Sequence, residues 1–342
     1  MKNFHEKENK NNCWIISDNT KGMLNQSIAL ANALNIKTEH ILAIPTPLLR
    51  LFPTLANIPG WQLTLGKKPN WLKLGYFPSI IITCGKRMAG ISIGIKRLSK
   101  GFTKTIHIQD PNVDSSNFDL LIVPEHDYFF KQKKSLFKDN VIFTKGSLNY
   151  LTNKIINESY IKISNQFLSL KKPIIAILIG GNNKRYKLKN YDYEIFSNKL
   201  VGLSKKTGIS LAIIPSRRTT KKGLRIIKEK FEKDLDKNRF LIYEPSKLNL
   251  YPGILKIAKS IIVTTDSINM QTEVCITRKP IFLYEMRSET GKIDFFKKFL
   301  IKEGYAKTFE ELEKNPKLIN TKFKQLNEIK NIAKTVRSRL NI

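Results

Sequence analysis

Two polar loops in the first half of the chain contain residues that could accept a proton. Asp18 follows a short apolar run, and a second loop places His126 between the carboxylates Glu125 and Asp127. A carboxylate or an imidazole can take the proton of a hydroxyl group when it lies beside the reacting atoms and has a suitable pKa. We therefore predict Asp18 and His126 as catalytic residues. The alternatives are a loop hydrogen bond for Asp18 and a structural role in a turn for His126.

Glycines and cations that follow apolar runs in the second half predict an anion-binding site. The loop Gly180-Gly181-Asn182 follows the run at 174–179. Two glycines allow main-chain N–H groups to approach a phosphate closely. Lys184 is near enough in sequence to add positive charge, and Ser216 and Arg217 follow the next run, where a guanidinium suits bidentate phosphate contact. The pattern is neither G-x-G-x-x-G nor a Walker loop, and ordinary turns remain the alternative.

A third polar segment of the second half follows the apolar run that ends near residue 264. Ser267 can cap the helix that comes next, and the N-terminus of a helix attracts a diphosphate. Glu273 would lie about two turns into that helix, where a carboxylate can accept hydrogen bonds from a ribose diol. The alternative for Glu273 is a helix residue that faces solvent.

Short apolar runs alternate with amphipathic stretches along the whole chain, which indicates an α/β fold with parallel strands. Ligands of such sheets bind beyond the carboxyl ends of the strands, which is where the polar loops lie. We expect strands at 13–16, 40–44, 79–85, 105–108, 120–123 and 141–144, and in the second half at 174–179, 210–214, 240–243, 260–264 and 280–283.

The pattern predicts two Rossmann-like, doubly wound domains that face a cleft. Their expected bounds are 1–170 and 171–315, separated by the breaker Lys171-Lys172-Pro173. Residues 316–342 are expected to form a C-terminal amphipathic helix that packs on the protein body, because apolar side chains recur there at helical spacing. A surface that touches acidic lipid is the alternative for this helix.

The chain is strongly basic: 60 Lys and Arg against 28 Asp and Glu give a formal charge of +32 over 342 residues. A composition rich in Lys, Asn and Ile explains this charge as well as an anionic partner does, whether phosphate, lipid or nucleic acid. No zinc finger, RNP-like strand or reading helix is recognisable, which argues against nucleic acid.

Cysteines and apolar segments bear on the compartment and on metals. Cys13, Cys84 and Cys275 are scattered, so neither a disulfide framework nor a structural zinc site is indicated. Asp110 with the acids of the His126 loop would make at most a weak cation site. No secretory leader or apolar stretch of about 20 residues is recognisable, so we expect a cytoplasmic protein.

Taken together, the motifs resemble those of the bacterial relatives of the plant elongated-mitochondria fission protein. The resemblance extends roughly from Trp14 to Tyr305 and rests on Ser17-Asp18…Gly22…Asn25-Gln26, Ile108-Gln109-Asp110-Pro111, Pro124-Glu125-His126-Asp127, Ile179-Gly180-Gly181-Asn182, Pro215-Ser216-Arg217-Arg218-Thr219 and Thr265-Asp266-Ser267…Met270…Glu273. It implies a fold similar to that of GT-B glycosyltransferases. The first domain would be the acceptor side and the second the nucleotide-donor side.

The resemblance also implies roles for individual residues. By analogy with the lipid-linked N-acetylglucosaminyltransferase of peptidoglycan synthesis, a nucleotide-sugar donor would contact Gly180, Gly181, Asn182, Lys184, Ser216, Arg217, Ser267 and Glu273. The acceptor side would contain Lys21, Gly22, Gln26, Asp110, Glu125 and Asp127. The chain departs from the family at Asn19, where Gly is usual, and at Met23, where a polar residue is usual. Asp18 and His126 therefore remain the candidate bases.

The resulting hypothesis is a metal-independent enzyme that transfers a sugar from a nucleotide to a hydroxyl acceptor and needs no obligatory cofactor. A basic surface would suit a lipid-linked acceptor and peripheral contact with the anionic inner membrane. The alternatives are a non-catalytic adaptor at the membrane surface and a nucleotide-sugar epimerase. The sequence leaves open the donor, the acceptor, the stereochemistry and the oligomeric state.

Overall fold

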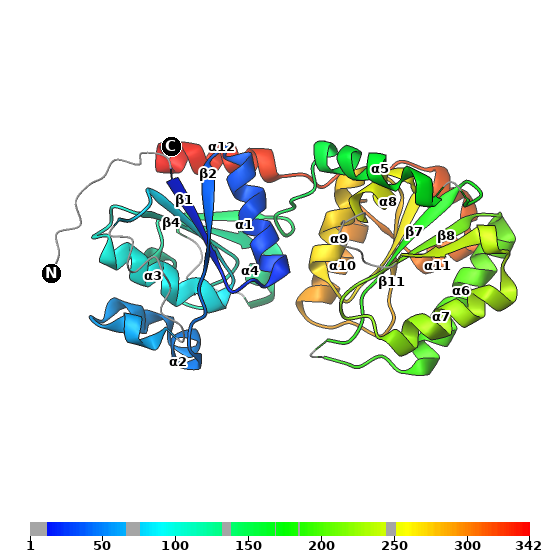
Figure 1. Ribbon diagram of the computed structural model, residues 1–342, viewed down its shortest axis with the longest axis horizontal. Coiled ribbons are helices and arrows are strands. Elements are labelled where there is room, and N and C mark those ends of the chain that lie inside the picture. The colour runs from blue at the N-terminus through cyan, green and yellow to red at the C-terminus, as the bar shows by residue number, and fades with distance from the viewer. Residues whose placement is uncertain (1–11, 66–75, 132–137, 168, 184, 244–250) are drawn as a thin grey trace. The chain divides into compact units, whose positions relative to one another are not determined.

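The computed structural model describes residues 12–65, 76–131, 138–167, 169–183, 185–243 and 251–342. The chain forms two compact units (Figure 1): unit 1 comprises Met1–Tyr150 with Glu328–Ile342, and unit 2 comprises Leu151–Asn327. Each unit contains a six-stranded sheet with helices around it. The predicted α/β fold with two Rossmann-like units is therefore confirmed.

In unit 1 the parallel strands lie in the order β2-β1-β3-β4-β5-β6. Their bounds are β1 (Asn12–Ser17), β2 (Lys37–Leu42), β3 (Ile80–Cys84), β4 (Lys104–Ile108), β5 (Leu120–Pro124) and β6 (Val141–Thr144). The α-helices are α1 (Lys21–Ala33), α2 (Pro47–Leu51), α3 (Ala89–Leu98), α4 (Glu125–Lys131) and α12 (Ile329–Leu340). Short 3-10 helices are η1 (Pro53–Asn57), η2 (Trp61–Thr64), η4 (Lys86–Met88) and η5 (Ser115–Asn117).

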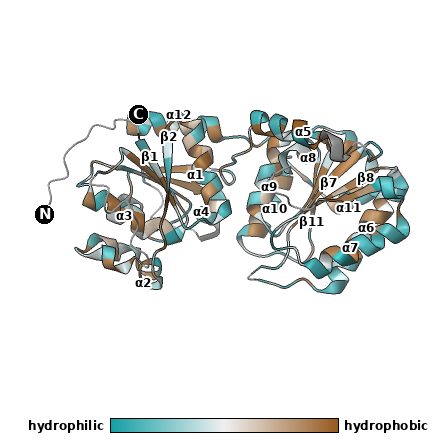
Figure 2. Cartoon of the chain, in the orientation of Figure 1, coloured by the Kyte–Doolittle hydropathy of each residue, from teal (hydrophilic) through white to brown (hydrophobic). Residues whose placement is uncertain are grey.

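Strand β1 explains why this sheet is apolar on both faces. Cys13 and Ile15 pack in one core with residues of α1 and α12, whereas Trp14 and Ile16 pack in another core with residues of α3 and η2. Successive side chains of a strand point to opposite faces, so a strand covered on both sides is a continuous apolar run. Figure 2 shows the result as brown strands between helices whose outer faces are largely teal.

In unit 2 the parallel strands lie in the order β12-β11-β10-β7-β8-β9. Their bounds are β7 (Ile174–Ile179), β8 (Ser210–Pro215), β9 (Phe240–Ile242), β10 (Ser260–Thr264), β11 (Ile281–Tyr284) and β12 (Lys307–Thr308). The α-helices are α5 (Asn153–Phe167), α6 (Asn190–Thr207), α7 (Lys221–Asp234), α8 (Tyr251–Ile257), α9 (Ile268–Val274), α10 (Lys292–Lys302) and α11 (Phe309–Lys314). The 3-10 helices are η7 (Lys237–Arg239), η8 (Cys275–Thr277) and η9 (Pro316–Asn320).

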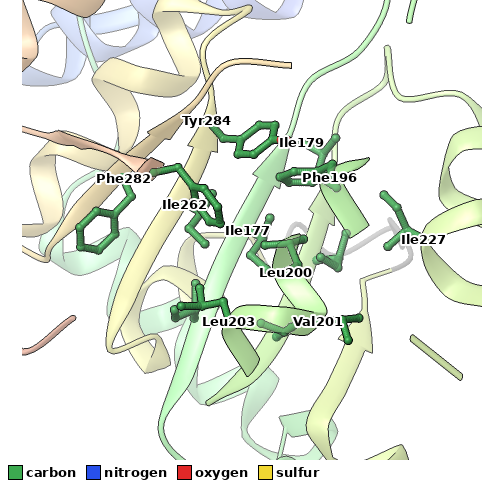
Figure 3. Packing of buried hydrophobic residues seen from close by; sticks show 14 of the residues in the cluster. Ile177, Ile179, Phe196, Leu200, Val201, Leu203, Ile227, Ile262, Phe282 and Tyr284 are labelled. Carbon is green, nitrogen blue, oxygen red and sulfur yellow. The ribbon is translucent and has the colours of Figure 1, made fainter. Parts of the chain in front are cut away.

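The main core of unit 2 joins its sheet to α6. Ile177 and Ile179 of β7 belong to one buried cluster with Phe196 and Leu200 of α6, as Figure 3 shows. The ring of Phe196 lies 4.4 Å from that of Tyr284 on β11, measured between centroids. This packing fixes β7 and β11 beneath the loops that follow them.

The division into units differs from the predicted domains at two places. Helix α5 belongs to unit 2, so the boundary follows Tyr150 and not residue 170. The physical cause is close packing on α8: a Cβ on Gly253 would lie 2.7 Å from the main chain of Ser159, and the Gly253 amide donates to Ser159 Oγ at 3.0 Å. Glycine is therefore what lets the two helices approach.

The second difference concerns residues 316–342, which were expected to form one helix. The helix α12 begins only at Ile329, and it packs on unit 1 through the buried residues Ile332, Ala333 and Val336. Arg337 Nη2 also donates to the carbonyl of Leu34 at 2.6 Å, just after α1. Residues up to 327 belong to unit 2. Among helices in the described ranges, none combines the length and apolar composition needed to cross a membrane.

Candidate functional site

A buried carboxylate, Asp266, joins three loops at the carboxyl edge of the unit 2 sheet. Its Oδ1 accepts a hydrogen bond from Thr264 Oγ1 at 2.7 Å, and its Oδ2 lies 2.5 Å from Nη2 of Arg218. The amide of Gly181 donates to Oδ2 at a longer 3.3 Å. The loops after β7, β8 and β10 therefore meet at one charged group, whose burial is tolerable because a cation and hydrogen-bond donors surround it.

The two glycines after β7 are needed by this packing. A Cβ on Gly180 would lie 1.9 Å from Oδ1 of Asp266, and a Cβ on Gly181 would lie 2.0 Å from the carbonyl oxygen of Arg218. The Gly180 amide donates to Thr264 Oγ1 at 2.8 Å. The sequence analysis predicted that a phosphate would lie close to these glycines. In the structure, Asp266 and the main chain of Arg218 lie close to them instead. Both glycine amides also donate to acceptors within unit 2.

Ser216 and Thr219 hold the loop after β8 against the loop after β7. Thr219 Oγ1 donates to the carbonyl of Gly180 at 2.6 Å and accepts from the Ser216 amide at 2.9 Å. Ser216 Oγ accepts from the Arg218 amide at 3.1 Å, and the Asn182 amide donates to the Arg218 carbonyl at 3.2 Å. Ser216 and Asn182, which were both predicted to contact the nucleotide-sugar, therefore shape the loop from which Arg218 projects.

Of the two predicted cations, the structure describes Arg217. Arg217 is exposed, and it is the next residue, Arg218, that reaches Asp266. Lys184 lies outside the described residues.

A second polar group at the same edge was missed from the sequence. After β11, the fully buried side chain of Glu289 accepts a hydrogen bond from Tyr186 Oη at 2.6 Å through Oε1, and Nη2 of Arg185 lies 3.1 Å from its Oε2. Burial raises the pKa of Glu289 against the opposing effects of Tyr186 and Arg185. Burial and the bond to Glu289 raise the pKa of Tyr186. The sequence could have indicated Glu289, because this residue follows a predicted strand of the same sheet.

Ser267 and Glu273 lie where the sequence predicted, on the helix that follows β10. Ser267 is the N-cap of α9, and its Oγ accepts from the Met270 amide at 3.5 Å. Glu273 is half-buried, and its Oε2 accepts from Tyr251 Oη of α8 at 3.2 Å. The N-cap prediction for Ser267 is confirmed, and Glu273 does not simply face solvent.

In unit 1, Asp18 forms the loop hydrogen bond that was the alternative to catalysis. Its Oδ1 accepts from the Thr20 amide at 3.0 Å, and Nη1 of Arg87 donates to its Oδ2 at 3.1 Å. Partial burial favours the neutral acid, but the bonds from Thr20 and Arg87 outweigh it and lower the pKa of Asp18. Asn19 has a φ of 60°, a conformation that Gly adopts easily and Asn tolerates, which explains this departure from the family pattern.

Three of the acceptor-side residues, Lys21, Gly22 and Gln26, lie on α1. Lys21 is exposed at its start, and the carbonyl of Gly22 accepts from Nε2 of the buried Gln26 at 3.2 Å. These contacts stabilise the first turn of the helix.

His126 and Asp127 are both buried on α4, and Glu125 begins that helix. Burial raises the pKa of the Cys84 thiol, and the negative charges of Asp127 and Asp18 raise that pKa further. The two acids therefore lie near the end of β3.

Asp110 lies after β4, where its Oδ1 accepts from the Asn112 amide at 2.8 Å. Within the described ranges, His, Cys, Asp and Glu side chains form no group of three suited to a metal ion.

The two Rossmann-like units, with polar loops at the carboxyl edges of parallel sheets, define the GT-B class of fold. Solved structures agree. The UDP-GlcNAc 2-epimerase of Methanocaldococcus jannaschii matches 96% of this chain and 98% of its own with a TM-score of 0.61 at 14% identity. The MurG structure from Acinetobacter baumannii matches 96% of this chain and 99% of its own with a TM-score of 0.52 at 14% identity. At such identities the likeness concerns the fold alone.

The chain belongs to the mitochondrial fission ELM1 family, whose model matches residues 21–340. The uncharacterized protein RP120 of Rickettsia prowazekii is 28% identical and aligns over 97% of this chain and 99% of its own length. The mitochondrial fission protein ELM1 of Arabidopsis thaliana is 25% identical over 69% of this chain. That match spans 58% of the plant protein. The predicted family resemblance is therefore confirmed.

Proposed function

We propose that unit 2 binds the diphosphate of a nucleotide-sugar and that the protein transfers the sugar to a hydroxyl acceptor. The observation that carries the proposal is Arg218, which a buried Asp266 fixes at the carboxyl edge of three parallel strands, where open α/β sheets bind their ligands. The ion pair involves Nη2, and a guanidinium has five N–H donors, so donors remain for a phosphate. The similar epimerase structures that hold UDP or UDP-GlcNAc support this choice of ligand.

The chemistry follows from where charge develops during transfer. Negative charge grows on the departing nucleoside diphosphate, and the guanidinium groups of Arg218 and the exposed Arg217 would stabilise it without a metal or other cofactor. We also propose, from the family resemblance, that Lys184, Ser267 and Glu273 contact the nucleotide-sugar. Asp18 and His126 remain the proposed bases. The lowered pKa of Asp18 makes its carboxylate a weak proton acceptor, which favours His126.

An exposed apolar surface supports a lipid-linked acceptor at an anionic membrane. We define the apolar face as Leu48, Leu51, Phe52, Ile58 and Leu63, which are 51%, 74%, 57%, 54% and 79% exposed. They belong to the layer formed by α2, η1 and η2. Large exposed apolar patches commonly mark interaction sites, and the net charge of +32 complements acidic headgroups.

The underside of this layer is firmly attached to unit 1. A Cβ on Gly90 would lie 2.7 Å from Cδ1 of Leu49, and a Cβ on Gly94 would lie 2.2 Å from Cζ2 of Trp61. Leu49 and Trp61 therefore occupy the space that two glycines of α3 leave open. Because the inner side is packed in this way, the apolar face is a fixed feature of the fold.

Calorimetric titration with uridine, adenosine, guanosine and cytidine diphosphates tests the nucleotide site. We expect one of them to bind and Arg218→Gln to weaken that binding at least tenfold, or by about 1.4 kcal/mol. The matched control is Arg225→Gln on α7, whose side chain is 69% exposed. Glu273→Gln provides a second variant if Arg218→Gln perturbs folding. Failure of all four diphosphates to bind would contradict the proposal.

Two other functions remain in competition, each favoured by one observation. The apolar face favours a non-catalytic membrane adaptor, and the TM-score of 0.61 with a 2-epimerase favours epimerisation of a nucleotide-sugar. Product analysis separates them: transfer releases free nucleoside diphosphate, whereas epimerisation yields a nucleotide-sugar of unchanged mass. An adaptor would bind vesicles and leave a bound nucleotide-sugar intact.

A further inference from the structure

Two adjoining depressions lie on unit 2 at the opposite edge of the sheet from Asp266. One of about 430 Å³ is lined by residues of α5 and by residues before β10 and β11, including Lys256, Arg278 and Lys279. The other, of about 460 Å³, shares Arg278 and adds Lys322 and Lys324. Because β10 and β11 are parallel, the residues that precede them lie at the amino edge. Among the residues that the structure describes, neither lining includes a carboxylate.

The cations of these depressions differ in their counterions from the cations on other faces of the unit. Within the described part of the chain, none of the five lies within 4.0 Å of a carboxylate oxygen. On other faces of unit 2, cations do pair with acids, as in Lys199–Glu313 at 3.0 Å and Lys307–Glu311 at 2.8 Å. A group of like charges without counterions repels itself, and an added anion would relieve that repulsion.

Neutral groups hold these cations in place. The ammonium of Lys279 donates to the carbonyls of Lys256, at 2.6 Å, and of Ala258, at the end of α8. Lys256 Nζ lies 2.6 Å from Oδ1 of Asn157 and 4.7 Å from the centroid of the Tyr160 ring. These contacts position the positive charges while leaving them unneutralised.

Arg278 lies between the two depressions. Its main chain has a φ of 56°, and its Nε donates to Gln325 Oε1 at 2.7 Å. Gln325 is fixed in turn by a 2.6 Å bond from its Nε2 to the carbonyl of Ile276. The contact with Gln325 uses one of five guanidinium donors, so the rest remain for a ligand.

The ammonium group of Lys279 is shifted towards its neutral form by burial and by neighbouring lysines. Burial, together with the charges of Lys259 and Lys256, lowers the pKa of Lys279 to about 8. Such a group favours a bound anion, because the anion restores the charged form of the ammonium. A cavity of this volume is also within the usual range for small-ligand sites, roughly 300–1,000 Å³.

We propose that the depressions around Arg278 form a second anion site, which binds a ligand carrying two or more phosphate groups. Such a ligand spans several cations at once, and phosphate oxygens accept from both guanidinium and ammonium groups. This site lies at the opposite edge of the sheet from the proposed nucleotide site, and it does not depend on that proposal.

The test is calorimetric titration of the full chain with inorganic tripolyphosphate, for the wild type and for the double variant Lys256→Gln with Arg278→Gln. We expect binding that the double variant weakens at least tenfold. The control double variant, Arg225→Gln with Lys228→Gln on α7, removes the same net charge from two i,i+4 ion pairs and should change the affinity less than twofold. Nucleoside diphosphate titrations of the same variants should be unchanged, so the two sites can fail separately.

Two arms identify the source of the phosphates. Vesicles containing a phosphomonoester lipid compete with tripolyphosphate if a headgroup is the ligand, and vesicles of a zwitterionic lipid do not. If tripolyphosphate binds and neither vesicle competes, the ligand is a soluble polyphosphate. Absence of binding, or equal affinity in both double variants, would overturn the proposal.

Discussion

Arg218 and Asp266 form an ion pair at the carboxyl edge of the unit 2 sheet, with 2.5 Å between Nη2 and Oδ2. The Asp266 side chain is 2% exposed and that of Arg218 is 36% exposed, so the pair connects a buried charge to the surface. A buried carboxylate needs this compensation. The pair consequently fixes the loops after β8 and β10 to each other, and the glycine loop after β7 must fit against both.

The first prediction concerns Gly180. We expect Gly180→Ala to destabilise unit 2 by several kcal/mol, at the upper end of the usual range of about 0.5–3 kcal/mol or beyond it, because the new Cβ would lie 1.9 Å from Asp266. Thermal unfolding followed by circular dichroism measures the effect. The control is Gly202→Ala within α6, where a Cβ meets no atom within 4 Å; it should stabilise the helix by about 0.5–1 kcal/mol. Equal melting temperatures for the two variants would contradict this account.

The second prediction concerns the Tyr186 hydroxyl. Tyr186→Phe removes a 2.6 Å hydrogen bond to Glu289, whose side chain is fully buried. The loss should cost about 1–3 kcal/mol of unfolding free energy, because a buried acceptor loses its partner. Tyr191→Phe is the control: the residue is 47% exposed, so water can replace the hydrogen bond that its Oη accepts from Arg287, and the change should cost less than about 0.5 kcal/mol. A Tyr186→Phe variant as stable as the wild type would disprove the role of this bond.

The third prediction concerns the pH dependence of unit 1. Burial lowers the pKa of His107 to about 3, against a smaller opposing effect of Asp110. The unfolded chain binds a proton near pH 6.5, so this group's contribution to stability is present above that pH and is lost as pH falls from about 6.5 towards 3, at about 1.4 kcal/mol per pH unit.

Urea unfolding of the wild type and of His107→Gln between pH 7 and 4 tests this sign. All three tryptophans lie between residues 14 and 71, so their fluorescence reports on unit 1. Other groups titrate in both proteins, so we compare how steeply the free energy of unfolding changes with pH in the wild type and in the variant. We expect the variant to lose less stability as pH falls; identical slopes would show that His107 binds its proton over the same pH range in the folded and the unfolded chain.

The fourth prediction concerns the apolar face. Leu51→Gln with Leu63→Gln should reduce binding to vesicles containing anionic lipid at least tenfold, measured by co-sedimentation. The control is Ile161→Gln with Ile195→Gln on unit 2, where the side chains are 73% and 49% exposed. Losing two apolar side chains there should have little effect. Equal loss in both double variants, or self-association without vesicles, would assign this face to another partner.

Much of the fold follows from local sequence. Apolar runs such as 174–179 and 260–264 are too short for helices and have the length of strands. Because both faces of these strands are apolar, their sheet must be covered by helices on both sides. The strands predicted in both halves are present with small changes of bounds. The two-residue strand β12 was missed, because Lys307 and Thr308 form no apolar run.

The sequence by itself determined which segments are strands and that polar loops gather at their carboxyl ends, because the repeat of apolar residues along a strand is a local property. Only the tertiary structure decided that Arg218 and not Arg217 pairs with Asp266, and that the packing of this carboxylate requires glycine at position 180. It also decided that α5 belongs to unit 2 and α12 to unit 1. Those outcomes depend on which side chains meet across segments far apart in the chain. Such contacts are set by packing between elements, and no local pattern encodes them.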